Sequence, residues 1–240
     1  MKFLPIDGRR SQEAFIQPHS SISFIDGDIV KVEFKDLGRS IGRKASVLEK
    51  FGNQNNSQSV SLISIHEYEI PTEFSAAAID LATDAKPPML DDNRKDIRNI
   101  DLITIDGSDA RDFDDAVWAE KDQTKNNKDG WRIIVAIADV AHYVKPDDAL
   151  DVEARKRGNS VYFPDRVVPM LPEALSNGMC SLRPNEDRAC LAVQITIDNQ
   201  GKKLSHKFFR ALMRSKARVT YEDLQSTFDS KEKIQSSGDF

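Results

Sequence analysis

Residues 103–117 read ITIDGSDARDFDDAV, and this stretch determines how the rest of the chain is interpreted. Five aspartates fall within ten of its positions: Asp106, Asp109, Asp112, Asp114 and Asp115. Apolar residues lie directly before and after them, which is unusual for an acidic surface loop. The pattern predicts a strand, a tight turn at Gly107 and a second strand that leaves the turn.

Carboxylates at this density repel one another unless some take up protons or a cation lies between them. Mg²⁺ prefers carboxylate and phosphate oxygens, and it can activate water against a phosphodiester. In an extended segment Asp112 and Asp114 share one side while Asp115 points to the other, and Asp106 approaches from across the turn. The stretch therefore favours an Mg²⁺ site over a solvated acidic loop, which stays the alternative. A Ca²⁺ loop would need D-x-D-x-D-G and a distal Glu, which are absent here.

The stretch DLITIDGSDARDFDDAV, residues 101–117, closely resembles the signature of the RNB catalytic domain in the RNase II/RNase R family of 3′→5′ exoribonucleases, and favours the RNase R branch. The resemblance continues through WRIIVAIADVAHYV, GNSVYFPDRVVPMLPEALSNGMCSLRPNEDR and FFRALMRSKARVTYEDL. It covers nearly all of residues 95–228 with long, specific motifs.

The resemblance implies an Mg²⁺-dependent hydrolase that degrades single-stranded RNA processively from its 3′ end and releases nucleoside 5′-monophosphates. It implies that metal-activated water attacks the scissile phosphate. The implied metal-site carboxylates are Asp106, Asp112, Asp114 and Asp115, and Asp114 is the one most closely tied to the chemical step. Asp109 departs from this set. It is expected to be a turn residue or to contact the ligands without binding the metal itself. Tyr162 is expected to stack on a base near the 3′ terminus.

The predicted fold class is α+β, with a small β-barrel of OB or cold-shock type ahead of the RNB domain. The expected divisions are residues 1–70 for the barrel, 71–94 for a linker and 95–240 for the N-terminal part of a truncated RNB domain. Strands are predicted at 29–34 and 45–51, a basic turn, GRSIGRK, at 38–44, and a polar loop at 53–59. Phe15, Phe24 and Phe34 are either core residues or a stacking surface for nucleic acid.

Within the RNB part, residues 115–120 and 131–139 predict one hairpin, and 191–198 and 203–213 predict another. Helices are expected over 74–81, from Asp147 to Gly158, from Pro172, and from Thr220. Asp139 is expected to cap the turn after its strand, with proximity to the metal site as the lesser alternative. His142 is assigned no role.

Composition sets limits on the function. The 240 residues are 39% hydrophobic and 30% charged, with a net charge of −5, so the chain lacks the basic excess typical of nucleic-acid binders. The acidic stretch itself supplies five of the negative charges. Cys180 and Cys190 are expected to be buried, reduced thiols. No apolar run approaches the ~18 residues of a membrane span, and no signal peptide is recognised, so a cytoplasmic location is expected.

Three alternatives to an active nuclease stay open. The chain could be an RNA-binding fragment that no longer cleaves, a non-functional remnant with exposed apolar surface, or an acidic Ca²⁺-binding structural domain. Members of the resembled family continue well past residue 240, so the chain is expected to be a fragment.

Overall fold

The computed structural model describes residues 2–6, 14–16, 22–35, 44–55 and 57–230. The chain forms two compact units. The first comprises Met1–Thr72 together with Val161–Val168, and the second comprises Glu73–Ser160 and Pro169–Phe240. Both units combine strands with helices or hairpins, and the predicted α+β class is confirmed.

A four-stranded sheet in the order β1-β2-β4-β3 forms the first unit. Its strands are β1 Lys2–Phe3, β2 Ala14–Ile16, β3 Asp28–Lys35 and β4 Lys44–Asn53. A turn at Gly27, where φ is +85°, precedes β3, which pairs antiparallel with β4. The strands predicted at 29–34 and 45–51 are thus confirmed. The predicted basic turn lies outside the described residues except for its last position.

The aromatic residues of the first unit differ in burial. Phe34 is 40% exposed and packs edge-on against Phe3, with 6.1 Å between the ring centroids. Phe24 is half-buried, and the side chain of Phe15 lies outside the described residues. Phe34 is therefore not a buried core residue of this sheet.

Helix α1, Ser57–Glu67, begins inside the segment predicted to be a loop, so that prediction is wrong for residues 57–59. The hydroxyl of Ser59 is buried and donates to the carbonyl of Asn53 at 2.9 Å. Ser61 is also buried, and its hydroxyl donates to the carboxylate of Asp165 in the hairpin formed by β9, Val161–Tyr162, and β10, Val167–Val168. Because these bonds satisfy buried hydroxyls, a polar sequence can form a packed helix.

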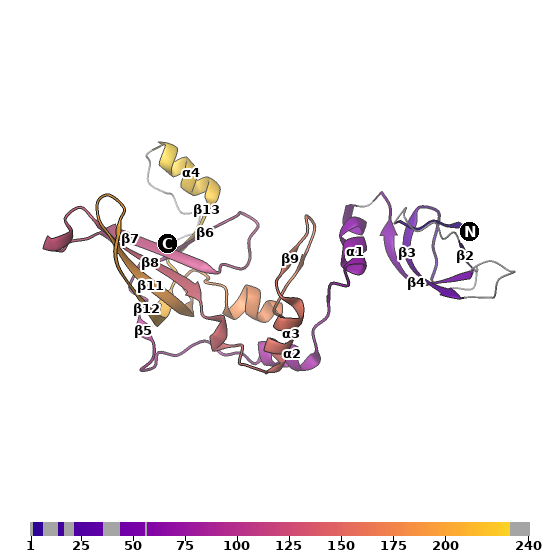
Figure 1. Cartoon of the computed structure of the whole chain (residues 1–240), viewed down its shortest axis with the longest axis horizontal. Helices are drawn as coiled ribbons and strands as arrows, with labels where there is room; N and C mark the ends of the chain where they lie inside the picture. Colours follow the sequence, from indigo (N-terminus) through magenta and orange to yellow (C-terminus); the bar gives the residue numbers. More distant parts are fainter. Residues whose placement is uncertain (1, 7–13, 17–21, 36–43, 56, 231–240) are drawn as a thin grey trace. The chain divides into compact units, whose positions relative to one another are not determined.

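A seven-stranded sheet in the order β13-β6-β7-β8-β11-β12-β5 frames the second unit (Figure 1). Its strands are β5 Lys95–Asp96, β6 Ile103–Asp106, β7 Asp115–Lys121, β8 Trp131–Ala138, β11 Asp187–Ile197, β12 Lys203–Arg214 and β13 Ala217–Thr220. The edge pairs β13–β6 and β12–β5 are parallel, and the inner pairs are antiparallel.

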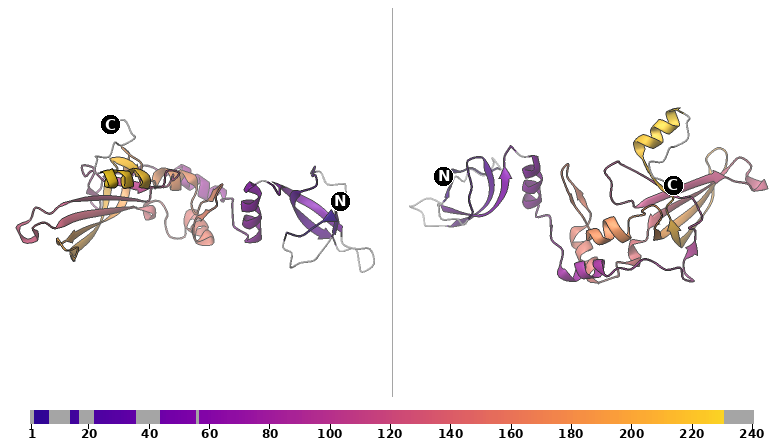
Figure 2. Two further views of the ribbon diagram at one scale, coloured as in Figure 1. Left: turned by 90° about the horizontal axis from the view of Figure 1, so that it is seen from above. Right: turned by 180° about the vertical axis from the view of Figure 1, so that it is seen from behind.

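Both predicted hairpins, β7–β8 and β11–β12, are confirmed. Their tips lie at one end of the sheet, because Trp131 at the start of β8 pairs with Ile197 at the end of β11 (Figure 2). The acidic stretch joins β6 to β7 and therefore lies at the opposite end.

Residues of the sheet and of three helical segments form one hydrophobic core. These segments are α2 Ala76–Thr83, α3 Ala149–Arg157 and a π-helix Ala174–Met179. Ala116, Ala136 and Ala192 are fully buried on neighbouring strands, and their small side chains allow close approach of the helices. Within the described part of the chain, no helix has both the length and the apolar content of a membrane span.

The predicted caps at Gly158 and Thr220 are confirmed, and Asp148 is an N-cap that was not predicted. Asp148 accepts a hydrogen bond from the amide of Asp151 at 2.8 Å at the start of α3, and Gly158 ends that helix with φ of +80°. Helix α4, Tyr221–Ser230, begins where the Thr220 hydroxyl accepts from the amide of Asp223 at 3.1 Å. Two 3₁₀ turns, Lys125–Asn127 and Val140–His142, complete the elements.

Asp139 does not cap the turn that follows β8, so that prediction is wrong. Its carboxylate is buried and accepts from Arg94 and from Arg210, each at 2.7 Å. A buried carboxylate is stable as an anion when cations pair with it, and two guanidinium groups supply that pairing here. His142, which was assigned no role, lies 3.1 Å through Nδ1 from Nη2 of Arg94.

The two cysteines are free and buried, as predicted. Burial raises the pKa of both thiols to about 12, so they stay protonated at neutral pH. They therefore act as small apolar core residues.

Candidate active site

The acidic stretch forms the connection between two neighbouring strands. β6 ends at Asp106 and β7 begins at Asp115. The amide of Ala110 donates to the carbonyl of Gly107 at 3.1 Å and closes the predicted turn. The predicted order of strand, turn and strand is thus confirmed, and it places Asp106 and Asp115 at the ends of adjacent strands.

Four aspartates of the stretch influence one another electrostatically. Loss of solvation is the largest cause of the raised pKa of Asp114, and the charges of Asp112, Asp115 and Asp106 raise it further. Burial is also the first cause of the raised pKa of Asp106, followed by the charges of Asp115 and Asp112. The four predicted metal-site carboxylates are therefore near enough to repel one another.

Asp109 lies apart from this group in its contacts. It is exposed, and it is not among the causes that raise the pKa of Asp106 or Asp114. Its Oδ1 lies so close to Gly107 that a methyl group at that glycine would come within 3.1 Å of it. These contacts are those of a turn residue.

Arg218 fixes the turn from outside the acidic stretch. Its Nη2 donates to the carbonyls of Gly107 and Ser108, both at 2.8 Å. Its guanidinium carbon lies 4.9 Å from the ring centroid of Phe113, and its charge lowers the pKa of Asp106. The position follows from the parallel pairing of β13 with β6, which sets Arg218 opposite Thr104. Sequence reasoning missed this residue, because it lies far along the chain from the turn.

Ser181 holds the other arm of the connection. Its hydroxyl accepts from the amide of Phe113 and donates to the carbonyl of Arg111, both at 3.1 Å. The carbonyl of Phe113 in turn accepts from the amide of Leu182 at 2.8 Å. The backbone of both arms is therefore tied to neighbouring elements.

An open groove of about 630 Å³ adjoins the connection. Three arginines line it, Arg111, Arg183 and Arg218, with Glu173 as its acidic member. The π-helix forms one wall through Ala174, Asn177 and Gly178. Guanidinium groups beside a carboxylate cluster suit a phosphodiester, because the arginines attract the anion that the aspartates alone would repel.

The donor chemistry of the site fits a hard divalent cation. Oδ2 of Asp106 is buried and makes no hydrogen bond to any described residue, and such an oxygen can be satisfied by a cation. All four candidate ligands are carboxylates, which Mg²⁺ prefers. Among the described side chains, however, no three acidic, histidine or cysteine groups converge tightly enough to cage an ion.

Two known domain families match this chain. The RNB domain matches residues 94–239, more than half of the chain, and a cold shock domain matches residues 3–75. The chain belongs to the RNB-domain family. The family resemblance predicted from the sequence is thus confirmed, as is the pairing of a cold-shock-like region with an RNB domain.

Curated RNB-domain relatives are longer than this chain. Ribonuclease R of Vibrio parahaemolyticus is 44% identical over 237 residues, a match that covers 96% of this chain and 28% of the relative. Ribonuclease R of Escherichia coli is 40% identical over 222 residues, covering 91% and 27%. The chain therefore spans little more than a quarter of the length of these relatives.

Solved structures of the family share this fold. Mycoplasma genitalium RNase R in complex with double-stranded RNA matches with a TM-score of 0.78 at 27% identity, over 93% of this chain and 40% of that one. Yeast Ssd1, described as a pseudonuclease, matches with a TM-score of 0.65 at 14% identity, over 98% of this chain and 30% of that one. The second likeness concerns the fold alone.

Tyr162, the predicted stacking residue of this RNB-domain chain, lies in β9 opposite Val167 of β10. Its side chain is 63% exposed. The hairpin belongs to the first unit, whereas the four aspartates belong to the second. An exposed aromatic ring on a short hairpin is suited to stacking on a base.

Proposed function

We propose that this chain carries part of the catalytic centre of a 3′→5′ exoribonuclease of RNase R type, which degrades single-stranded RNA processively to nucleoside 5′-monophosphates with Mg²⁺. The observation that carries the proposal is the gathering of Asp106, Asp112, Asp114 and Asp115 beside an arginine-lined groove. The relatives named ribonuclease R support the substrate and the direction of cleavage.

The aspartates would hold the cation, with Asp114 as the residue most directly involved in cleavage. A bound Mg²⁺ would supply a Lewis acid that lowers the pKa of water and offsets the charge that develops on the phosphate. Arg111 and Arg183 would orient the phosphodiester in the groove, and Arg218 would hold the turn that positions Asp106. Mutual repulsion among unliganded carboxylates favours cation uptake.

RNA would reach the site through additional contacts. RNase R of Mycoplasma genitalium is described in complexes with double-stranded RNA and with ribose-methylated single-stranded RNA, which supports an RNA ligand for this chain. Tyr162 would stack on a base near the 3′ terminus, and residues 1–70 would bind RNA ahead of the catalytic part at 95–240, with 71–94 as the link.

The test combines the purified chain with Mg²⁺ and a 5′-labelled single-stranded RNA. Asp114→Asn is compared with Asp109→Asn, which removes the same charge from the same stretch. We expect stepwise shortening of the RNA by the unsubstituted chain and by Asp109→Asn, and none by Asp114→Asn, while all three bind RNA alike. Equal loss of the cleavage rate in both variants would refute the assigned role of Asp114, because the rate would then depend only on the total charge of the acidic stretch.

A second candidate function is RNA binding without cleavage. Two observations favour it: a cold shock domain matches residues 3–75, and among the described side chains no three acidic, histidine or cysteine groups converge tightly enough to cage an ion. Retained RNA binding with no shortening by the unsubstituted chain would support this candidate over the first.

A further inference from the structure

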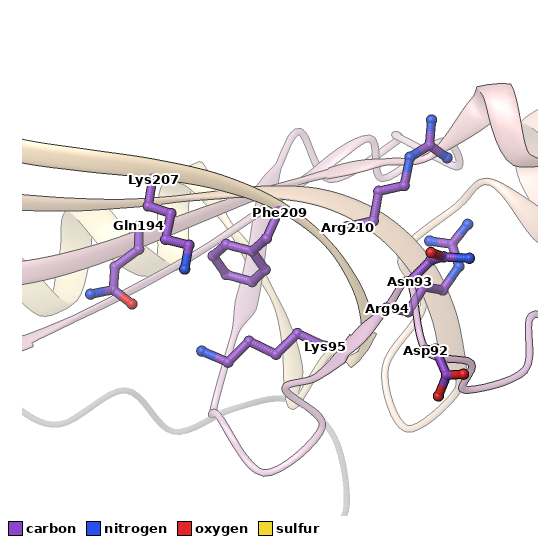
Figure 3. Close-up of a pocket in the computed structure, with 8 residues that line it drawn as sticks. All are labelled: Asp92, Asn93, Arg94, Lys95, Gln194, Lys207, Phe209 and Arg210. Atoms are coloured by element: carbon purple, nitrogen blue, oxygen red, sulfur yellow. The ribbon is translucent and has the colours of Figure 1, made fainter.

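A second concave site lies at the far edge of the sheet, away from the acidic connection. It is a cavity of about 310 Å³ between β5, β11 and β12 (Figure 3). Its lining residues are Asp92, Asn93, Arg94, Lys95, Gln194, Lys207, Phe209 and Arg210. β6 and β7, which carry the acidic connection, are separated from this edge by β8 and β11.

The charge of this pocket is opposite to that of the chain. Four of its eight lining residues are basic and one, Asp92, is acidic, whereas the whole chain has a net charge of −5. The buried Asp139 behind the pocket neutralises one further charge. The local balance is then four positive against two negative charges, a net +2, so the pocket attracts anions.

The arginine end of the pocket is built on the buried ion pair described above. Arg94 is almost fully buried and donates to Asp139, and it also contacts His142. Burial first, and then the charge of Arg94, lowers the pKa of His142, so the ring is neutral at pH 7. Arg210 pairs with the same carboxylate but is half exposed. Its guanidinium is therefore fixed at one end and accessible to solvent.

The lysine end is organised around Phe209. Nζ of Lys95 lies 5.1 Å from the centroid of that ring, a cation–π contact that restrains a flexible side chain. Figure 3 shows that the ammonium groups of Lys95 and Lys207 and the amide of Gln194 lie on the same side of Phe209. Lys207 and Gln194 face each other in the β11–β12 register. Within the described residues, neither lysine has an acidic partner within ion-pair distance.

We propose that this pocket is an auxiliary phosphate site that binds the backbone of a nucleic-acid strand. Two ammonium groups and one amide can surround a phosphate. Lys207 and Phe209 share one face of β12, whereas Arg210 projects from the other face, so the phosphate is bound at the lysine end of the pocket. The pocket cannot be part of the acidic site itself. Asp115, Ile137, Leu191 and Arg210 form one cross-strand row, and three strand intervals separate the ends of that row by about 14 Å.

The choice of a nucleic-acid strand rests on the proposed function, whereas the anion preference does not. A strand bound at both places would be tethered near the acidic connection while its end is processed. Such a tether raises the effective concentration of RNA at the active site, and in the intact enzyme it would lower KM without changing kcat.

Binding is measured with the full chain carrying Asp114→Asn, so that a short fluorescently labelled oligouridylate is not consumed. In this background Lys207→Gln is compared with Lys203→Gln, which removes the same charge from an exposed position on the same strand outside the pocket. We expect Lys207→Gln to weaken binding about threefold or more and to reduce the salt dependence of log K by about 0.7. Equal losses in the two variants would overturn the proposal.

NMR spectroscopy of the isotopically labelled chain identifies the source of the phosphate through chemical-shift changes of backbone amides. We expect the oligouridylate to shift the amides of Lys95 and Lys207. If inorganic phosphate or uridine 5′-monophosphate shifts these amides but the oligonucleotide does not, the ligand of the pocket is a free phosphate and not a nucleic-acid strand. No shifts with any of the three would refute the pocket as an anion site.

Cleavage is followed separately with Asp114 intact. A chain that binds RNA through the pocket without shortening it would leave this inference standing and remove the proposed activity. If the unsubstituted chain shortens RNA and Lys207→Gln leaves both the affinity and KM unchanged, the proposed activity would stand and this inference would be refuted.

Discussion

Nη2 of Arg94 lies 2.7 Å from Oδ2 of Asp139, and both side chains are only 4% exposed. Removing one partner of a buried ion pair leaves the other charge without compensation. We expect Asp139→Asn to destabilise the second unit by about 3 kcal/mol. Urea unfolding followed by tryptophan fluorescence measures this loss.

The matched control is Asp147→Asn, because Asp147 pairs with Arg155 on the surface, where it is 86% exposed. An exposed pair contributes about 1 kcal/mol or less. A loss of similar size in both variants would show that the burial of Asp139 does not matter.

Arg218 is expected to act as a positioning residue. Lysine at this position keeps the charge but cannot bond two carbonyls in the same geometry. We expect Arg218→Lys to slow cleavage about tenfold, or ~1.4 kcal/mol, and to raise the Mg²⁺ concentration for half-maximal rate. Arg132→Lys, at an arginine paired with Glu120 away from the connection, should change neither quantity. An unchanged Mg²⁺ requirement in Arg218→Lys would contradict the positioning role.

Mg²⁺ should stabilise the chain through the aspartates. A ligand that binds only the folded state, at a concentration ten times its Kd, increases the free energy of unfolding by about 1.4 kcal/mol. For a protein of this size, that increase raises Tm by about 4 °C. We expect Asp114→Asn to abolish this increase and to raise Tm slightly without Mg²⁺, because repulsion with Asp112, Asp115 and Asp106 is relieved. Thermal melts with and without chelator measure both effects. An Mg²⁺ response that survives the substitution would place the metal elsewhere.

Acid should weaken the network around Arg98. Hydrogen bonds from Arg98 lower the pKa of Asp96 to about 2. Burial alone would raise the pKa of Asp187, but hydrogen bonds from Arg214 and Arg98 lower it by more. A carboxylate whose pKa is lowered in the folded state stabilises the fold. This stabilisation is complete above the ordinary pKa of 3.8 and is lost as the pH falls toward the pKa of the folded state.

We therefore expect Arg98→Gln to be less stable than the unsubstituted chain at neutral pH, with the difference shrinking between pH values of about 4 and about 2. Urea midpoints over that range provide the measurement. A difference that stays constant across it would mean that Arg98 stabilises by packing and not by charge.

Tyr162 should contribute to RNA affinity by stacking. Loss of one aromatic–base stack costs about 1–3 kcal/mol, so we expect Tyr162→Ala to weaken binding about tenfold and Tyr162→Phe to leave it almost unchanged. Tyr221→Ala removes a comparably exposed ring from α4 and serves as the control. Equal weakening in both alanine variants would argue against a specific stack.

The elements that the sequence predicted correctly are those with local signals. β3 alternates with period two, and the β11–β12 hairpin has Gly201 at φ +82° in its turn. The acidic connection was likewise predicted because its aspartates lie within one short stretch. By contrast, α1 was missed because its buried face uses serine hydroxyls, which hydrophobic periodicity does not detect.

The missed contacts of the second unit have a different cause. The sequence predicts a cap at Asp139 because its actual partners, Arg94 and Arg210, lie 45 and 71 positions away. A lone acidic residue after a strand is locally consistent with capping, and only the tertiary fold brings two arginines to it. The same holds for Arg218, whose role depends on the parallel pairing of β13 with β6.

The clamp of Arg218 on Gly107 joins positions 111 residues apart. Contacts of such long sequence separation form late in folding, because the intervening chain must first be ordered. During translation at roughly 5–20 residues per second, the ribosome needs on the order of 5–20 seconds to add those residues. A nascent chain therefore carries its aspartates for that interval without the guanidinium that fixes them, and completion of the acidic connection is a late event in biosynthesis.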